Sequence, residues 1–389
     1  MQSLLFLYFD GLNHPVQLTG CDHLLDDFPV IFPQQDYHEG KCDDKPLISI
    51  VYEAGEYHFS ASWIDKSVSY SDKADVLCDL IAKLAVARSF TDLETIYLHA
   101  AAVLINGKAV VFPSIYRSGK SFLTANLVAE GHRYIGDDVI PLSLESCKGY
   151  SAGFAPRMRL PLPETTDEKT RSFIEGHIAL EGKRYAYLDL EPELQVPCTE
   201  RIDMGAFVLL DRQQGVTAHL DELPVADVFQ QLIKQNFARE IDSSRILSTL
   251  TQVVSNSQCL KLTYDRADEA VRLLTNHFMQ WPAQDNALQF GTDIQDADAT
   301  IPDDCLIRNR HVQKIRIEDE NFLASPDGKK IYHLNQIGSG IWELLSEPTS
   351  KEEIISILET AFPGAERTVI EKDVKKILGK FQFTGLIEY

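Results

Sequence analysis

The chain has 389 residues, of which 44% are hydrophobic, which is enough for two or three folded cores. Its 37 basic and 58 acidic side chains give a net charge of −21, which argues against nucleic acid as a partner. The seven cysteines are odd in number, scattered and without a Cys-x-x-Cys pair, and no stretch approaches the length of a membrane span, so we expect a cytoplasmic protein with reduced thiols and no zinc site.

Residues 1–90 are expected to form an α+β accessory lobe. The apolar run after Met1 has no basic residues in front of it and no small-residue cleavage site, so it predicts a first strand rather than a signal peptide. Strand-like runs follow at 47–52 and 57–60, and an apolar pattern predicts a helix over about 72–90.

A strand-to-helix turn follows at residues 108–130. The run 108–112 predicts a short strand and 122–130 has helical periodicity, so Gly119-Lys120-Ser121 opens a helix directly after a strand. Such a turn can hold phosphate on backbone N–H groups, with a lysine adding positive charge and a serine hydroxyl binding Mg²⁺. The loop is degenerate, because Ser114 and Arg117 occupy positions where small residues are usual. An ordinary turn stays open as the alternative.

Two further motifs flank this loop. His99 lies in Leu98-His99-Ala100-Ala101-Ala102-Val103, and Gly131-His132-Arg133 is followed by Asp137-Asp138. Taken alone, His99 is typical of a core histidine and the Asp pair of a solvated turn. Together with the loop, however, the segment from His99 to Asp138 resembles the catalytic core of HPr kinase/phosphorylase and its relatives.

The resemblance implies an α/β P-loop kinase core, over residues 91–281, that uses ATP and Mg²⁺. It implies catalytic roles for Asp138, His99 and Lys120. It also implies that Ser121 binds Mg²⁺, with Asp137 as a second candidate for the metal site. Members of the family form oligomers through the kinase core, so the resemblance also allows a homo-oligomer. We expect nucleotide contacts from Ser114, Arg117, Ser118, Gly119, Lys120 and Ser121. For Arg117, a side chain in solvent is the alternative.

The family's second, Glu-containing signature has no match in residues 151–161. Arg157 and Arg159 in this stretch could contact a phosphate, but their alternation with Met158 and Leu160 is more typical of the exposed face of a strand, which we prefer. The rest of the core is predicted to contain strands at 204–211 and 259–264 and helices at 225–237 and 267–279.

Residues 282–304 are rich in Asp, Ala, Gln and Pro and lack periodicity, which predicts an interdomain linker. Beyond it, residues 305–389 predict three strands at 312–317, 321–324 and 329–334, followed by three helices at 336–345, 351–361 and 369–383. Asn335 is a suitable N-cap for the first helix, and Thr349 or Ser350, followed by Glu352 and Glu353, is suitable for the second.

This order, with Tyr332-His333-Leu334-Asn335, Ile341-Trp342-Glu343-Leu344-Leu345 and Gly385-Leu386-Ile387-Glu388, resembles a PqqD domain. The resemblance implies a small α+β, winged-helix-like fold that recognises the leader of a ribosomally made precursor peptide. In that family the leader pairs with a strand edge and packs against the third helix. Trp342 is expected in the core.

Lys372, Lys376 and Lys380 recur at steps of four along the third predicted helix and therefore share one face, which would attract an acidic leader. A solvated helix face is the equal alternative. Residues 301–389 hold 12 basic and 15 acidic groups, so most of the negative charge lies in the first 300 residues.

These observations favour an ATP-dependent kinase that phosphorylates a hydroxyl, with serine as first choice, of a precursor peptide held by the PqqD-like domain. The alternative is a non-catalytic protein that binds the peptide and presents it to another modifying enzyme. Ser114 and Arg117 favour the alternative, whereas the presence together of His99, Lys120, Ser121 and Asp138 opposes it.

Overall fold

The computed structural model describes residues 3–41, 45–113, 118–282 and 302–388. The chain divides into two compact units. The first comprises residues 1–223, 231–240 and 252–285, and the second comprises 224–230, 241–251 and 286–389. Among the described residues, no helix is both long enough and apolar enough to cross a membrane.

The first unit begins with a six-stranded sheet in the order β3-β1-β2-β4-β5-β6. Its strands are β1 (Leu4–Phe9), β2 (Val16–Thr19), β3 (Tyr37–Glu39), β4 (Ile48–Glu53), β5 (Glu56–Ala61) and β6 (Val68–Tyr70). A 3₁₀ helix, η1 (Asp22–Asp27), and α1 (Phe28–Ile31) connect β2 to β3. The predicted first strand and the strands near 47–60 are therefore present.

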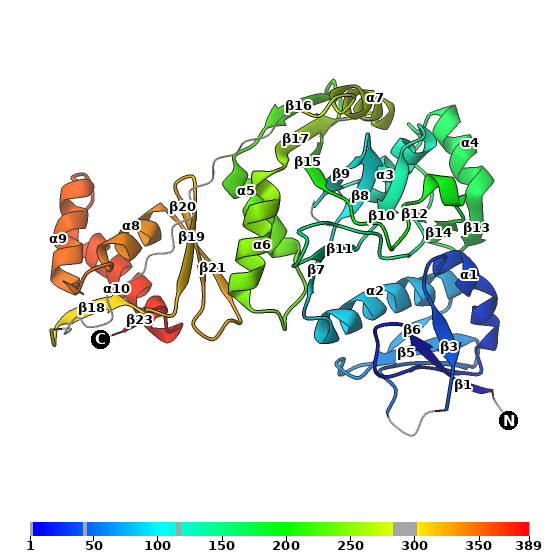
Figure 1. Cartoon of the computed structure of the whole chain (residues 1–389), viewed down its shortest axis with the longest axis horizontal. Coiled ribbons are helices and arrows are strands. Elements are labelled where there is room, and N and C mark those ends of the chain that lie inside the picture. The colour runs from blue at the N-terminus through cyan, green and yellow to red at the C-terminus, as the bar shows by residue number, and fades with distance from the viewer. Residues whose placement is uncertain (1–2, 42–44, 114–117, 283–301, 389) are drawn as a thin grey trace. The chain divides into compact units, whose positions relative to one another are not determined.

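Helix α2 (Lys73–Thr91) lies between this sheet and the rest of the unit (Figure 1). Asp72 caps it, accepting a hydrogen bond from the Ala74 backbone N–H at 2.9 Å. Its buried residues surround the helix rather than forming one stripe, because it contacts β5 and β6 on one side and β7 and β14 on the other. The apolar pattern that predicted this helix includes Leu77, Leu80, Ile81 and Leu84, which are all buried.

The core of this unit is a second six-stranded sheet in the order β10-β8-β9-β15-β17-β16. Its strands are β8 (Ala101–Ile105), β9 (Lys108–Phe112), β10 (Arg133–Gly136), β15 (Met204–Arg212), β16 (His219–Glu222) and β17 (Gln258–Tyr264). The strands β9, β15 and β17 are parallel, as in α/β folds, and the outer pairings are antiparallel.

Helices α3 (Lys120–Ala129), α4 (Glu168–His177) and α7 (Ala267–His277) pack together beside this sheet (Figure 1). Leu123 and Leu127 of α3, Val110 of β9 and Leu274 of α7 belong to one buried apolar cluster. The remaining elements are β7 (Thr95–Leu98) paired with β11 (Ile140–Ser143), the sheet of β12 (Arg157–Arg159), β14 (Tyr185–Leu188) and β13 (Ile178–Glu181), and the 3₁₀ helix η2 (Pro192–Leu194).

Helices α5 (Val225–Gln235) and α6 (Ser243–Ser255) each contribute residues to both units. The second unit otherwise contains β18 (Cys305–Arg308), β19 (Gln313–Ile317), β20 (Glu320–Ala324), β21 (Ile331–Leu334), α8 (Gln336–Leu344), β22 (Thr349–Ser350), α9 (Lys351–Ala361), α10 (Arg367–Phe383) and β23 (Ile387–Glu388).

The three predicted strands form the antiparallel sheet β19-β20-β21, and the three predicted helices follow it. The prediction omitted a second small sheet, β22-β18-β23, because strands of two to four residues carry too little pattern to be read. Trp342 is buried, as predicted. Asn335 accepts from the Gly338 N–H at 2.8 Å, and Ser350 with Glu353 forms a capping box at the start of α9.

Candidate active site

The predicted strand-to-helix turn is present where β9 is followed by α3. Gly119 is the N-cap of α3 and has φ of 92°, a left-handed conformation that favours glycine. A Cβ at Gly119 would also lie 3.0 Å from the Tyr264 hydroxyl, so any other residue would require the tyrosine side chain to shift. Ser114 and Arg117, the residues that make the loop degenerate, lie outside the described residues.

Lys120 and Ser121 form the first turn of α3. Lys120 is only 6% exposed, and burial lowers the pKa of its ammonium group, whereas the carboxylates of Asp137 and Asp138 raise it. The Ser121 hydroxyl donates a hydrogen bond to Asp137 Oδ1 at 3.0 Å. The loop lysine and serine therefore face the downstream acidic pair, as the predicted site requires.

Asp137 follows β10 directly and is buried, at 8% exposure. Burial, followed by the neighbouring charge of Asp138, raises the pKa of the Asp137 carboxyl from 3.8 to about 7. Its second oxygen, Oδ2, is buried with no hydrogen-bond partner among the described residues. A solvated turn is therefore the wrong description of Asp137, because the carboxyl is held in the interior against Ser121.

Asp138 is part-buried and has φ of 72°. Its carboxylate forms an ion pair with Arg157 of β12. Burial lowers the pKa of the Arg157 guanidinium, but the negative charge of Asp138 raises it by more, so the pKa lies above its usual value. The preferred prediction for Arg157, an exposed strand face, is wrong, because long-range folding brings Asp138 against it. Arg159, two residues along the same strand, is exposed.

His99 lies in the short connection between β7 and β8, and its Nδ1 is 3.0 Å from the Asp138 carbonyl oxygen. A carbonyl oxygen can only accept, so Nδ1 carries a proton. Burial, and then the charge of Lys120, lower the pKa of the imidazole. The neutral ring therefore has its lone pair on Nε2.

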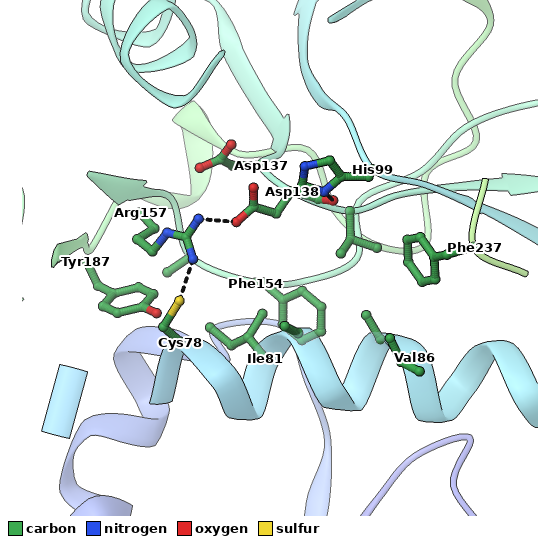
Figure 2. Close-up of a pocket in the computed structure, with 14 residues that line it drawn as sticks. Cys78, Ile81, Val86, His99, Asp137, Asp138, Phe154, Arg157, Tyr187 and Phe237 are labelled. Carbon is green, nitrogen blue, oxygen red and sulfur yellow. Dashed lines mark hydrogen bonds and ion pairs between the residues drawn. The ribbon is translucent and has the colours of Figure 1, made fainter. Parts of the chain in front are cut away.

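Two cavities meet at His99, Asp138 and Arg157. One, of about 520 Å³, is lined by residues 118–122 of the loop and α3 and by three arginines, Arg157, Arg159 and Arg212. With Lys120 the cavity has four cationic side chains against the single carboxylate of Asp138, which suits an anionic, phosphate-bearing ligand. The other, of about 280 Å³, lies against α2 and is mostly apolar (Figure 2).

Several of these lining residues were not found from the sequence. Arg212 ends β15 and Tyr185 lies on β14, opposite Arg159 in the strand register. The Arg157 guanidinium carbon lies 4.8 Å from the centre of the Tyr185 ring, which helps to fix the arginine. Only the alternation of residues 157–160 marked this strand, and nothing local indicated which face would meet the acidic pair.

No group of three or more His, Cys, Asp or Glu residues that could hold a metal ion exists within the described ranges. The predicted metal pair, Ser121 and Asp137, is nevertheless in contact, and one buried carboxylate oxygen lacks a partner. Hard oxygen donors of this kind fit Mg²⁺, which usually takes one or two protein ligands and completes its shell with phosphates and water.

The predicted peptide-binding residues Lys372, Lys376 and Lys380 lie on α10 of the second unit and are exposed. Val369 and Phe383, which are 51% and 91% exposed, fall on the same helix face by their spacing. This face therefore combines a row of three ammonium groups with apolar side chains at both ends.

A family model described as "Coenzyme PQQ synthesis protein D (PqqD)" matches residues 320–387. The C-terminal part of the chain carries a PqqD domain. The matched residues lie within 305–389, so the match confirms the resemblance to a PqqD domain that the sequence showed there.

Similar solved structures include TbiB1 in complex with the TbiA(beta) leader peptide, which is 27% identical, with 21% of this chain and 94% of that chain covered and a TM-score of 0.20. They also include the Hpr(Ser) kinase/phosphatase from Coxiella burnetii, at 14% identity, with 47% and 90% covered and a TM-score of 0.25. No curated protein matches the chain.

Proposed function

We propose that this chain is an ATP-dependent kinase that phosphorylates a hydroxyl, with serine as first choice, of a precursor peptide captured by its PqqD domain. The observation that carries the proposal is the convergence of Lys120, Ser121, Asp137 and Asp138 at the start of α3 beside a cavity rich in cationic groups.

The cavity at the N-terminus of α3 is the proposed nucleotide site. Backbone N–H groups at the helix start, with the positive end of the helix dipole, favour phosphate oxygens. Lys120 adds a buried positive charge beside them, and Arg159 and Arg212 line the same space. Ser121 and Asp137 would hold Mg²⁺, which when bound neutralises charge on the transferred phosphoryl group.

Asp138 is the proposed general base. Its carboxylate accepts the proton of the attacking hydroxyl as that oxygen bonds to the γ-phosphorus, and the bond from the γ-phosphorus to the bridging oxygen breaks to release ADP. Arg157, which pairs with Asp138 in the structure, also lines the nucleotide cavity. We infer that it turns to the γ-phosphate during the reaction, freeing the carboxylate. His99 holds the Asp138 backbone in place.

The PqqD domain is proposed to bind the leader of the precursor peptide. The exposed Lys372, Lys376 and Lys380, bordered by Val369 and Phe383, supply a surface for an acidic and partly apolar leader segment. Holding the leader raises the effective concentration of the acceptor, so the kinase site needs little affinity of its own.

The test is incubation of the full chain with ATP, Mg²⁺ and a leader-containing peptide encoded beside it. We expect a peptide that gains one phosphoryl group, located by fragmentation mass spectrometry, and no gain without ATP. Absence of transfer to any hydroxyl of the peptide, under conditions where the peptide binds, would contradict the kinase proposal.

The Arg157–Asp138 ion pair also suits a second candidate, a non-catalytic protein that presents the peptide to another modifying enzyme. In that case the acidic pair and Lys120 would hold the loop together rather than act on a nucleotide. Calorimetric titration with ATP, with and without Mg²⁺, distinguishes the two. The kinase proposal expects Mg²⁺-dependent binding, and the second candidate expects none.

A further inference from the structure

The smaller cavity offers an apolar surface directly beside the proposed base. Ile81 and Val86 of α2 point into it, and the rings of Phe154, beside Ile81, and Phe237 also line it (Figure 2). Ala82, on the same helix, is exposed at its rim. Its volume is about 280 Å³, just below the ~300–1,000 Å³ of pockets that enclose a whole small ligand. The size therefore suits a part of a larger ligand, such as a side chain.

The two cavities have different chemistry but share three residues, His99, Asp138 and Arg157. Lys120, Arg159 and Arg212 line the cavity on the α3 side, whereas the cavity on the α2 side is mostly aliphatic and aromatic. A general base must lie within hydrogen-bond distance of the attacking hydroxyl, which itself approaches the γ-phosphate in line with the bond that breaks. Asp138 lines both cavities and can therefore reach a hydroxyl placed where they meet. If the donor occupies the cationic cavity, the acceptor therefore approaches from the apolar one.

We propose that this cavity binds an apolar side chain adjacent to the acceptor hydroxyl and so selects serines that have an aliphatic or aromatic neighbour. The inference rests on the proposed kinase function and adds to it the sequence class of the acceptor. An acidic neighbour is disfavoured twice, because it would be desolvated among apolar groups and would lie near the carboxylates of Asp137 and Asp138. Burial of a leucine there improves kcat/KM by about tenfold or more over an acidic residue.

The experiment compares four precursor peptides with the same leader and acceptor serine, in which both neighbours of the serine are Leu, Phe, Ala or Asp. Phosphoryl transfer is measured with the full chain and with two variants. Ala82→Phe places a large side chain at the rim, where it can fill the cavity, and Val86→Ala enlarges it. Ala179→Phe, at an exposed alanine of β13 outside both cavities, is the matched control.

We expect the order Leu, then Ala, then Asp in the parent and in Ala179→Phe. In Ala82→Phe the Leu peptide should lose its advantage while the Ala peptide is still phosphorylated, and in Val86→Ala a Phe-flanked peptide should gain relative to Leu. Equal kcat/KM for the Leu and Asp peptides in the parent, or an unchanged preference in both cavity variants, would overturn the inference and leave the kinase proposal standing. Failure to phosphorylate any peptide would overturn both.

Discussion

Lys120 is a buried cation in the first turn of α3, near the carboxylates of Asp137 and Asp138. Replacing it with alanine removes charge stabilisation from the transferring phosphoryl group, so Lys120→Ala should lower turnover by about 100-fold or more. The fold should persist, because the substitution removes a charge that burial disfavours. Lys108→Ala, on the preceding strand and outside both cavities, is the control and should keep its turnover. Normal transfer by a folded Lys120→Ala protein would exclude the loop from catalysis.

The two neighbouring aspartates are predicted to fail in different ways. Asp138→Asn keeps the shape of the side chain but removes the base, so it should bind ATP and Mg²⁺ normally while peptide phosphorylation falls by about 100-fold or more. Asp137→Asn should instead weaken the Mg²⁺-dependent part of ATP binding. Calorimetry and a transfer assay on both variants test the division of roles. An active Asp138→Asn protein beside an inactive Asp137→Asn protein would reverse our assignment.

The raised pKa of Asp137 has a consequence for stability. The folded protein keeps this proton up to about pH 7, whereas the unfolded chain releases it near 3.8. Between these values the folded state binds more protons, so this group makes the protein less stable as pH rises, by at most about 1.4 kcal/mol per pH unit.

Urea denaturation of the metal-free protein between about pH 5 and pH 7 measures this contribution when Asp137→Asn is compared with the parent. The variant should lose the Asp137 part of the slope and be the more stable protein near neutral pH. Mg²⁺ should stabilise the parent more at pH 8 than at pH 6, because metal binding requires the ionised carboxylate. Parallel stability profiles for the two proteins would contradict the buried-acid assignment.

How far each site residue could be predicted depends on how local its signal is. Gly119, Lys120 and Ser121 lie within one strand-to-helix turn that the local sequence pattern predicts, and the structure places them at the start of α3. Arg157 could not be placed in the same way. Its partner Asp138 lies 19 residues away, and which face of β12 meets that carboxylate is decided by the pairing of β12 with β14. Alternation correctly predicted that Met158 is buried and Arg159 exposed, but it could not show that Asp138 lies against Arg157.

At the scale of elements, α2 shows what a sequence pattern can and cannot reveal. Its apolar residues predict the helix, and in the structure its buried residues lie around the axis, as in a helix covered on two sides. The sequence does not show which elements cover the helix, because this depends on tertiary packing. For the same reason it does not show that Ile81 and Val86 line a cavity beside Asp138. The short strands β18, β22 and β23 fall below the length at which periodicity can be recognised.

Helix α10 carries the prediction for leader binding. Reversing Lys372, Lys376 and Lys380 to Glu should slow association with an acidic leader and reduce the salt dependence of binding, with little change in dissociation. Reversing three exposed lysines of the first unit, Lys41, Lys45 and Lys66, alters net charge equally and should have little effect. Stopped-flow fluorescence with a labelled leader measures both rates. If the two triple reversals had equal effects, the three lysines of α10 would act only through the net charge of the protein and not through a local contact with the leader.

At the scale of the whole molecule, the chain joins a PqqD domain to a unit with a cationic, carboxylate-containing site. If the PqqD domain holds the acceptor through its leader, the proposed kinase site can have low affinity for the acceptor and still act efficiently. The reason is that a tethered acceptor has an effective concentration in the millimolar range. The narrow demand on the acceptor, an apolar neighbour in the α2 cavity, would then be enough for selection within one peptide.

This arrangement predicts how the reaction responds to loss of the leader. A core peptide without its leader should be phosphorylated with kcat/KM reduced by about 100-fold or more, and most of the loss should appear in KM, because the leader supplies encounter rather than transition-state contacts. Adding the free leader in trans should not restore the rate, since it fills the PqqD domain without bringing the acceptor. A peptide with a scrambled leader of the same composition controls for length and charge. Restoration in trans would show instead that the leader activates the kinase site, and the PqqD domain would then act as a regulator rather than a tether.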